Sequence, residues 1–493
     1  MSERKRLHPI AAIWNFLKQL KGMIFPLLVL LVGSNGIQSY WDYFPMGITV
    51  ISIVFALAAG IIKWRRFTYR LEDGELRIEY GLFVKKKRFI PFDRIQSFHF
   101  SQSILHRPFG LTRVEVETAG STDNRKSEAE LTAIYKHDAE WLEQTIRNSK
   151  KSQSMILESS LEDDQKTSAE AFIYKVAPRE LLLMATTSGG IGVVLSGVFA
   201  LWTQFDEYIP YQEIFDEMGK LVHNSIILIS AAIFIGFFLV WLISIFITML
   251  KYGNFTVRKD NDDIIITRGL VERKQITIPM KRVQAVRVAE NILRQPFGFA
   301  TVHLISAGGS VFQKESAAVM VLPIIKKKRI PEIMNNLLPD FGTEPEFARP
   351  PRRSLLRYVI IGEWKALIAA GALTWFLWPW GSLACILPLL AFVLAWSKYK
   401  AAGWAIDGHR LALQYRSIGK NTFFMNKNRI QSMQTKQSWF QQKNELETIK
   451  ATVKSGEAGR RVTVKYIESK DASHIYEWFT PAASQASLKK VES

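Results

Sequence analysis

The chain has 493 residues, of which 48% are apolar and 22% are charged, and its formal net charge is +19 at pH 7. This mixture excludes a disordered or collagen-like chain and is typical of membrane spans that alternate with soluble domains. One cysteine, Cys385, excludes an intramolecular disulfide framework and a cysteine-based zinc cluster. The excess of Lys and Arg indicates either nucleic-acid binding or surfaces beside an anionic membrane.

Six apolar runs follow one another along the chain as three pairs. A helix needs about 20 apolar residues to cross a bilayer core. The fourth run contains no charged residue, whereas the first has Lys18 and Lys21 near its start. A soluble core of this size would rarely hold six such runs, so buried soluble helices are the weaker alternative. The predicted spans are residues 17–37, 46–62, 181–202, 226–250, 358–378 and 380–396.

The distribution of basic residues predicts the topology. The loops within the pairs contain almost no Lys or Arg, whereas the flanking segments are basic. The positive-inside rule then places both termini and every segment between pairs in the cytoplasm. The basic flanks are Arg4–Arg6, Lys63–Arg66, Arg352–Arg353 and Lys398–Lys400.

The soluble segments are internal repeats. Residues 63–120 align with residues 251–308 without a gap at a shift of 188 residues, and a diverged third copy lies near a shift of 335. The motif Arg94-Ile95-Gln96 recurs as Arg282-Val283-Gln284 and as Arg429-Ile430-Gln431. A unit of one helical hairpin followed by one domain therefore occurs three times.

Each domain is predicted to consist of antiparallel strands closed by a helix. Apolar and polar residues alternate, and Asp73-Gly74 and Asp407-Gly408 are hairpin-turn signals. In the first domain the closing helix should direct Trp141, Leu142 and Ile146 inward. The fold class is thus a polytopic α-helical membrane protein with six spans in three hairpins and three cytoplasmic β domains. The predicted boundaries are 1–62 (N-terminus and hairpin one), 63–149 (domain one), 150–177 (linker), 178–250 (hairpin two), 251–338 (domain two), 339–353 (linker), 354–397 (hairpin three), 398–480 (domain three) and 481–493 (tail).

Two repeated motifs have a structural and a functional interpretation. In the Arg-Ile/Val-Gln motif the apolar residue should fill the core, although the arginines could contact lipid phosphates. Pro108-Phe109-Gly110 and Pro296-Phe297-Gly298 are predicted turns in which Pro ends a helical turn, Phe packs and Gly takes a positive φ. The third domain has Lys443-Asn444-Glu445 instead, so its turn must differ.

Two basic runs are candidate lipid-headgroup sites, and the alternative is a solvated cytoplasmic face. Each Lys or Arg near an anionic leaflet contributes about 1 kcal/mol. The runs are Lys85, Lys86, Lys87 and Arg88, and Lys326, Lys327, Lys328 and Arg329.

Small residues at every fourth position of the spans indicate close helix packing. These are Ser52, Ala56 and Gly60; Ser188, Gly192 and Ser196; and Ala366, Ala370 and Thr374.

Catalysis is poorly supported by the sequence. The eight histidines are scattered, and no metal-binding, nucleophile or phosphate-loop motif is recognisable. We therefore expect no catalytic residues, no metal and no cofactor. Nucleic-acid binding is also disfavoured, because neither a recognition helix nor an aromatic platform is apparent.

The repeated motifs resemble those of bacterial PH-like membrane proteins of the bPH2 class, formerly DUF304, in a triple-unit arrangement of the UPF0699 type. This resemblance implies a PH-like fold for each domain, a bacterial plasma-membrane location and a smaller one-unit relative of YdbS type as partner. It also implies an association with resistance to membrane-active bacteriocins. The motifs are Phe67-Thr68, Gly81-Leu82, Pro91, Arg94-Ile95-Gln96-Ser97 and Pro108-Phe109-Gly110.

The first functional hypothesis is a non-enzymatic membrane scaffold whose PH-like domains bind the anionic inner leaflet or protein partners. The alternative is a transporter or lipid-moving machine in which the spans form a path and the domains gate it. Polar residues that meet between spans would favour the alternative, and a solid apolar bundle would favour the scaffold.

Overall fold

The computed structural model describes residues 4–17, 20, 22, 43–118, 129–157, 173–188, 194–196, 226–307, 318–341, 345–456 and 459–480. These residues form two compact units, which are described separately below. The first unit comprises residues 1–170 with 271–277, and the second comprises residues 171–270 with 278–493.

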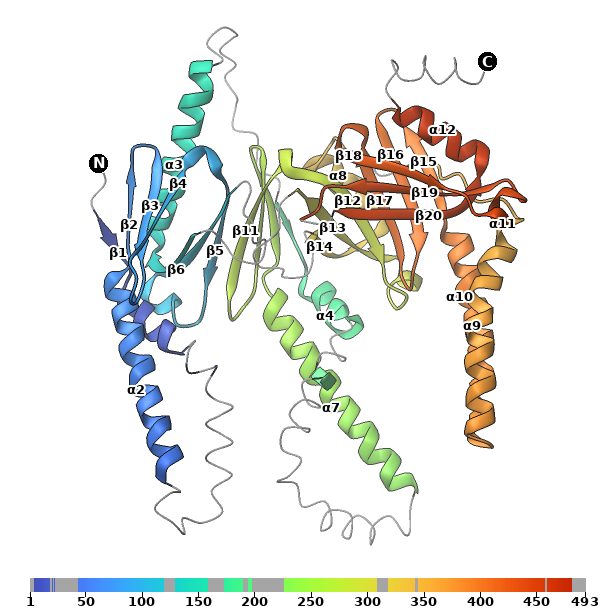
Figure 1. The fold of residues 1–493 in the computed structure, drawn as a ribbon, viewed down its shortest axis with the longest axis horizontal. Coiled ribbons are helices and arrows are strands. Elements are labelled where there is room, and N and C mark those ends of the chain that lie inside the picture. The colour runs from blue at the N-terminus through green and yellow to red at the C-terminus, as the bar shows by residue number, and fades with distance from the viewer. Residues whose placement is uncertain are drawn as a thin grey trace. The chain divides into compact units, whose positions relative to one another are not determined.

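The first domain consists of two antiparallel sheets and a C-terminal helix, and it follows directly on an apolar helix (Figure 1). The helix is α2 (Tyr43–Arg66). The first sheet has the order β1-β2-β3-β4, formed by β1 (Lys5–Arg6), β2 (Thr68–Glu72), β3 (Glu75–Tyr80) and β4 (Lys86–Pro91). The second sheet contains β5 (Ile95–Gln102), β6 (Leu111–Thr118) and β7 (Ala129–Tyr135), and α3 (Lys136–Leu157) follows it.

The second domain repeats this element order. Its apolar helices are α4 (Pro178–Thr187) and α7 (Ile226–Tyr252). Its strands are β8 (Ile173–Lys175), β9 (Thr256–Asp260), β10 (Asp263–Arg268), β11 (Arg273–Pro279), β12 (Val283–Glu290), β13 (Phe299–Ser306) and β14 (Ala318–Lys326), and α8 (Ile330–Leu337) ends the domain.

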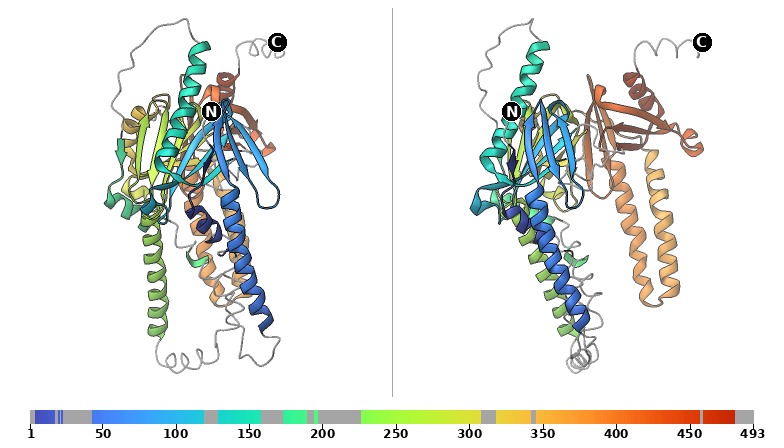
Figure 2. Two further views of the ribbon diagram at one scale, coloured as in Figure 1. Left: turned by 90° about the vertical axis from the view of Figure 1, so that its left-hand side faces the viewer. Right: turned by 60° about the vertical axis from the view of Figure 1, so that its left-hand side comes forward.

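The third domain follows a pair of apolar helices, α9 (Ser354–Phe376) and α10 (Ile386–Ala401), which lie side by side (Figure 2). Its strands are β15 (Gly403–Asp407), β16 (Arg410–Arg416), β17 (Lys420–Asn426), β18 (Ile430–Lys436), β19 (Leu446–Val453) and β20 (Arg460–Glu468). The short helix α11 (Trp439–Gln442) lies between β18 and β19, and α12 (Ser469–Phe479) follows the last strand.

The alternating strand patterns place one face of each sheet in a core. In the first domain the buried side chains include Leu76, Ile78 and Val114. The helix α3 adds Leu142 and Ile146 to this core, but Trp141 is 41% exposed. The prediction that Trp141 points inward is therefore wrong. A neighbouring residue lies about 100° away around a helix, and the Lys5 ammonium lies 4.8 Å from the Trp141 ring centroid.

Each of the three repeats begins with a short segment that precedes the hairpin and pairs with the domain of the same repeat. In the first domain Lys5 of β1 pairs with Tyr69, and in the second Tyr174 of β8 pairs with Val257. In the third, Ala348 forms a single bridge to Trp404. Parts of the segments predicted as linkers are thus sheet partners of the domains that follow them.

Consecutive domains are joined by strand pairing in one conserved register. In the first unit, Arg273 of β11 pairs with Gln102 of β5. In the second unit, Lys420 of β17 pairs with Glu290 of β12, within the sheet β14-β13-β12-β17-β16-β15. Gln102 and Glu290 are 188 residues apart, as the first two repeats are. Arg273 and Lys420 are 147 residues apart, as Arg282 and Arg429 are, so the two junctions are equivalent.

Four helices among the described residues are long and apolar enough to cross a membrane: Gly47–Arg66, Ile233–Tyr252, Ser354–Phe376 and Gly381–Ala401. They correspond to the second, fourth, fifth and sixth predicted spans. Most of the first predicted span, residues 17–37, and half of the third, residues 181–202, lie outside the described residues.

Candidate membrane-facing surface

Two turns of each domain lie at the end where the apolar helices join, which we call the helix-side end. The turns are residues 81–85 and 103–110, residues 269–270 and 291–298, and residues 417–419 and 437–445. Hydrogen bonds tie one turn of each domain to its helix. Arg66 Nη1 donates to Leu82 O at 2.6 Å, Leu270 N to Leu250 O at 2.9 Å, and Arg357 Nη2 to Phe440 O at 3.1 Å.

These turns carry exposed apolar side chains in all three domains. They include Phe83, Phe109, Leu293, Phe297, Ile418, Trp439 and Phe440. Leaving a side chain of this size in water forgoes about 1.5–3 kcal/mol relative to its burial. Trp, Phe and Leu are also the apolar side chains that interfacial segments bury at the headgroup boundary of a membrane.

The Pro-Phe-Gly turns only partly match their prediction. Gly110 and Gly298 have φ values of 62° and 69°, which confirms that glycine supplies the left-handed conformation. The prediction that Phe packs is wrong, because Phe109 is 55% and Phe297 67% exposed. Each Pro lies within a short 3₁₀ turn with the Phe, so the backbone turns the ring outward.

The third domain reaches the same surface with different residues. Glu445 has a φ of 53° and takes the place of the turn glycine. Trp439 and Phe440 of α11 supply the aromatic side chains, and the Arg357 guanidinium lies 5.1 Å from the Phe440 ring centroid. The third domain therefore presents exposed aromatic side chains at the same place as the other two, although it lacks the Pro-Phe-Gly motif.

Both predicted lipid-headgroup runs lie at or next to the helix-side end of their domain. Lys85 ends the 81–85 turn and Lys86, Lys87 and Arg88 begin β4, with all four side chains exposed. Lys85 Nζ lies 2.7 Å from Glu79, and this hydrogen bond lowers the pKa of the Glu79 carboxyl.

In the second domain the exposed run Lys326, Lys327, Lys328 and Arg329 joins β14 to α8. Lys327 N donates to Gly298 O at 2.9 Å, which fixes the run beside the Pro-Phe-Gly turn. Lys327 Nζ lies 3.4 Å from Glu290, whose side chain is almost fully buried. The run therefore adds positive charge directly beside Phe297.

The Arg-Ile/Val-Gln motif lies at the opposite end of each domain. It follows the turn in which Phe92 N donates to Gly74 O, so β5 separates it from the helix-side turns. Ile95, Val283 and Ile430 are buried, as the structural interpretation predicts. The arginines of this motif are consequently poorly placed for the lipids around their own helices.

Comparison with known proteins agrees with the three-part architecture. The family model described as "Bacterial PH domain" (bPH_2) matches residues 24–150, 217–340 and 359–483. The chain belongs to the bacterial PH domain family. It is 39% identical over 491 residues to the UPF0699 transmembrane protein YdbT of Bacillus subtilis (strain 168), which covers 97% of this chain and 99% of that relative. The protein is therefore a membrane protein with three PH domains.

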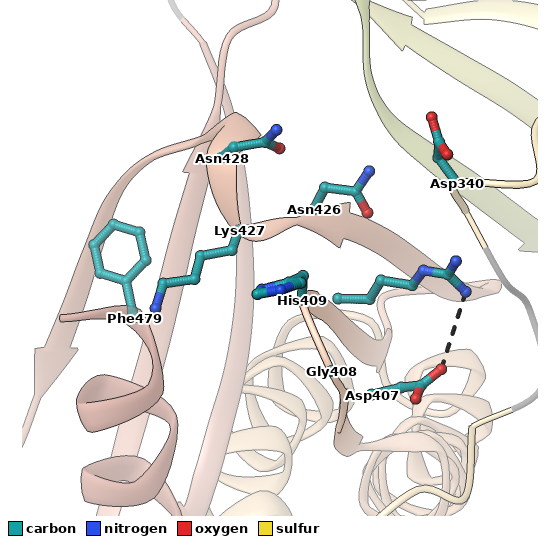
Figure 3. Close-up of a pocket in the computed structure, with 9 residues that line it drawn as sticks. Asp340, Asp407, Gly408, His409, Asn426, Lys427, Asn428 and Phe479 are labelled. Carbon is teal, nitrogen blue, oxygen red and sulfur yellow. Dashed lines mark ion pairs between the residues drawn. The ribbon is translucent and has the colours of Figure 1, made fainter. Parts of the chain in front are cut away.

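The third PH domain also contains an open cavity of about 1170 Å³ at the end away from α9 and α10 and beside the end of α12 (Figure 3). Its lining includes Asp340, His409, Asn426 and Phe479. The cationic groups already have partners in the chain. Lys427 Nζ donates to Trp478 O, and Arg410 Nη2 donates to Pro339 O at 3.1 Å and lies near Asp407. No set of charged groups converges on the cavity among its described lining residues.

Some of the small residues of the spans lie against other parts of the chain, whereas Ser196 is exposed. A side chain at Gly60 would meet Ala12 O at 3.2 Å, and Ala56 is buried; Ser52 is half-buried on the same helix. On α9, Ala370 is buried and Ala366 half-buried, and a side chain at Gly362 would contact Ala395 of α10. Ser188 and Ser196 are described, whereas Gly192 lies outside the described residues.

Proposed function

We propose that this protein is a non-enzymatic integral membrane scaffold. Its three PH domains lie in the cytoplasm with their helix-side ends against the inner leaflet, where they bind anionic lipids or protein partners. The observation that supports this proposal is the exposed set of aromatic and aliphatic side chains beside basic runs, such as Phe297 next to Lys326–Arg329.

Burial of Phe297 in the interface would contribute about 1.5–3 kcal/mol. Each nearby cation would add about 1 kcal/mol on an anionic leaflet. Salt would weaken this electrostatic contribution but not the contribution from apolar burial. The two contributions together would hold each domain in a fixed orientation, which a scaffold requires. A one-unit relative of YdbS type remains the proposed protein partner.

A depth measurement on the full chain tests this orientation. In a Cys385→Ser background, Phe297→Cys and the matched control His409→Cys are labelled with bimane and reconstituted in phosphatidylglycerol-containing nanodiscs. His409 is exposed at the far end of its domain. Lipids brominated in their acyl chains should quench the probe at 297 and leave the probe at 409 unchanged. Equal quenching at both sites, or none at 297, would contradict the proposal.

The physiological part of the proposal is protection against membrane-active bacteriocins, and it rests on the family resemblance. Deletion of the gene should increase sensitivity to such peptides, and expression of the intact chain should restore resistance. Unaltered sensitivity of the deletion strain would remove the protective role without affecting the depth measurement.

A further inference from the structure

In the two junctions between domains, a receiving strand of one PH domain pairs with an adding strand of the next, and each of the three domains contains a strand equivalent to each of these. The receiving strands are β5, β12 and β18, and the adding strands are β4, β11 and β17. The chain uses β5 with β11 and β12 with β17. Among the described residues, no strand pairs with the outer side of β18, which is the edge of the sheet β18-β19-β20.

The outward face of this last sheet is basic. Gln434 lies opposite Lys450, and Lys436 follows Gln434 on the same face of β18. On β20 the exposed Arg461 and Lys465 share this face. The pKa of Lys450 is lowered mainly by the charge of Lys436, so these cations repel one another. The equivalent positions of β5, namely Ser97, His99 and Ser101, are all at least 95% buried.

The junctions within the chain place opposite charges on the two sides. Glu290 of the receiving strand β12 lies 3.9 Å from Lys420 of the adding strand β17. In the first unit, desolvation raises the pKa of the buried Glu115 on β6, beside the receiving strand, and Lys274 of β11 is among the cations that oppose this rise. At β18 the receiving side is the basic one, so its partner must carry the acidic side chains.

A second copy of this chain does not fit that requirement. Its corresponding adding strand is β4, which is a sheet edge among the described residues and begins with Lys86, Lys87 and Arg88. In the register of the two internal junctions, Lys86 would lie opposite Lys436, and directly opposed like charges destabilise a strand pair. Lysines on an edge strand are also a common device against unwanted pairing.

We infer that β18 and its basic face form the docking site for a strand of a second protein that carries Asp or Glu opposite Lys436 and Lys450. The partner strand adds in the register of the β5–β11 and β12–β17 junctions. Main-chain hydrogen bonds supply the attachment, and the charges select the partner. This inference specifies the protein-binding part of the proposed scaffold, and its failure leaves the lipid-depth measurement intact.

Photo-crosslinking of the full chain in its native membrane tests the inference. The photoreactive residue p-benzoylphenylalanine replaces Gln434, whose counterpart Arg287 donates a hydrogen bond to Asn421 of the adding strand at 2.9 Å. The expected adduct joins residue 434 to a strand of a different protein that contains Asp or Glu at the paired positions, identified by mass spectrometry. An adduct with lipid, with Lys85–Pro91 of another copy, or with a segment lacking acidic residues would overturn the inference, as would no adduct.

Charge reversal separates specific pairing from incidental contact. The double variant Lys436→Glu/Lys450→Glu should reduce the adduct roughly tenfold. The matched control is Lys470→Glu, because Lys470 is exposed on α12 of the same domain and lies outside both β18 and the helix-side turns, and it should leave the yield unchanged. Replacement of the partner's acidic residues by Lys should restore the adduct of the double variant. Equal yields in all variants would reject the charge-based recognition.

Discussion

The strands β5 and β18 are the same strand of the repeat in two different surroundings. In β5, His99 is 2% exposed, lies opposite Ile276 of β11 and has Glu117 at 3.4 Å. In β18, the equivalent residue Gln434 is exposed beside Lys450. The strand itself is equally regular in both places. The two strands differ in that β11 pairs with β5 beside His99, whereas no described strand pairs with the outer side of β18, so the side chain of Gln434 stays in contact with solvent.

The largest expected effect comes from placing a carboxylate at this position in both strands. His99→Glu would bury a third carboxyl beside Glu115 and Glu117, at a cost of roughly 3–5 kcal/mol in the free energy of unfolding. Gln434→Glu should change it by less than about 0.5 kcal/mol, because the new carboxylate would be solvated. Urea-dependent pulse proteolysis of the full chain in detergent measures both. Similar effects of the two variants would break the comparison.

A smaller effect is expected at the end of the receiving strand. Glu290 is 6% exposed and lies between Lys327 and Lys420. Glu290→Lys would place a third cation beside Lys327 and Lys420 in a buried environment. It should lower the free energy of unfolding by about 2–4 kcal/mol. The equivalent variant Gln437→Lys in the third domain should be close to neutral. The same proteolysis assay measures both variants, and a larger loss of stability in Gln437→Lys than in Glu290→Lys would contradict this expectation.

The most gradual effect is a dependence on pH in the second domain. Desolvation, together with the nearby Arg287 and Arg460, lowers the pKa of His303 to about 3. Between pH 6.5 and pH 3 the unfolded chain binds a proton that the folded chain does not, so stability falls as the pH is lowered. The slope should reach at most about 1.4 kcal/mol per pH unit.

His303→Gln should reduce this acid-dependent loss. Lys450→Gln, at the equivalent place in the third domain, should leave the slope unchanged, because Lys450 is charged in both states over this range. An unchanged slope in His303→Gln would show that other groups cause the acid sensitivity.

The architecture of three units could be predicted because its signals are local. Repeats at a constant shift, hairpin turns such as Asp73-Gly74 and alternating strands each depend on nearby residues. Asp73 and Gly74 do adopt positive φ values of 53° and 73°. The family resemblance was carried by the same local motifs and is confirmed by the match of all three repeats.

The surfaces could not be predicted, because a pattern shows that a residue is apolar or polar but not what covers it. Phe109 was expected in the core and lies at the helix-side end, since an exposed and a buried Phe look alike in sequence. Ser97 and His99 are buried where β11 of the next repeat pairs with β5, and this pairing joins segments that are distant in sequence.

The most direct test of the account is the register of one junction between domains. In a Cys385→Ser background, Ala289→Cys with Asn421→Cys should form a disulfide in native membranes, because the two residues are paired across β12 and β17. Ala289→Cys with Thr422→Cys should not, because neighbouring residues of a strand point to opposite faces. Efficient crosslinking of the first pair alone is the predicted result. Equal crosslinking of both pairs, or of the second pair only, would contradict the shared register on which the docking site and the charge comparisons depend.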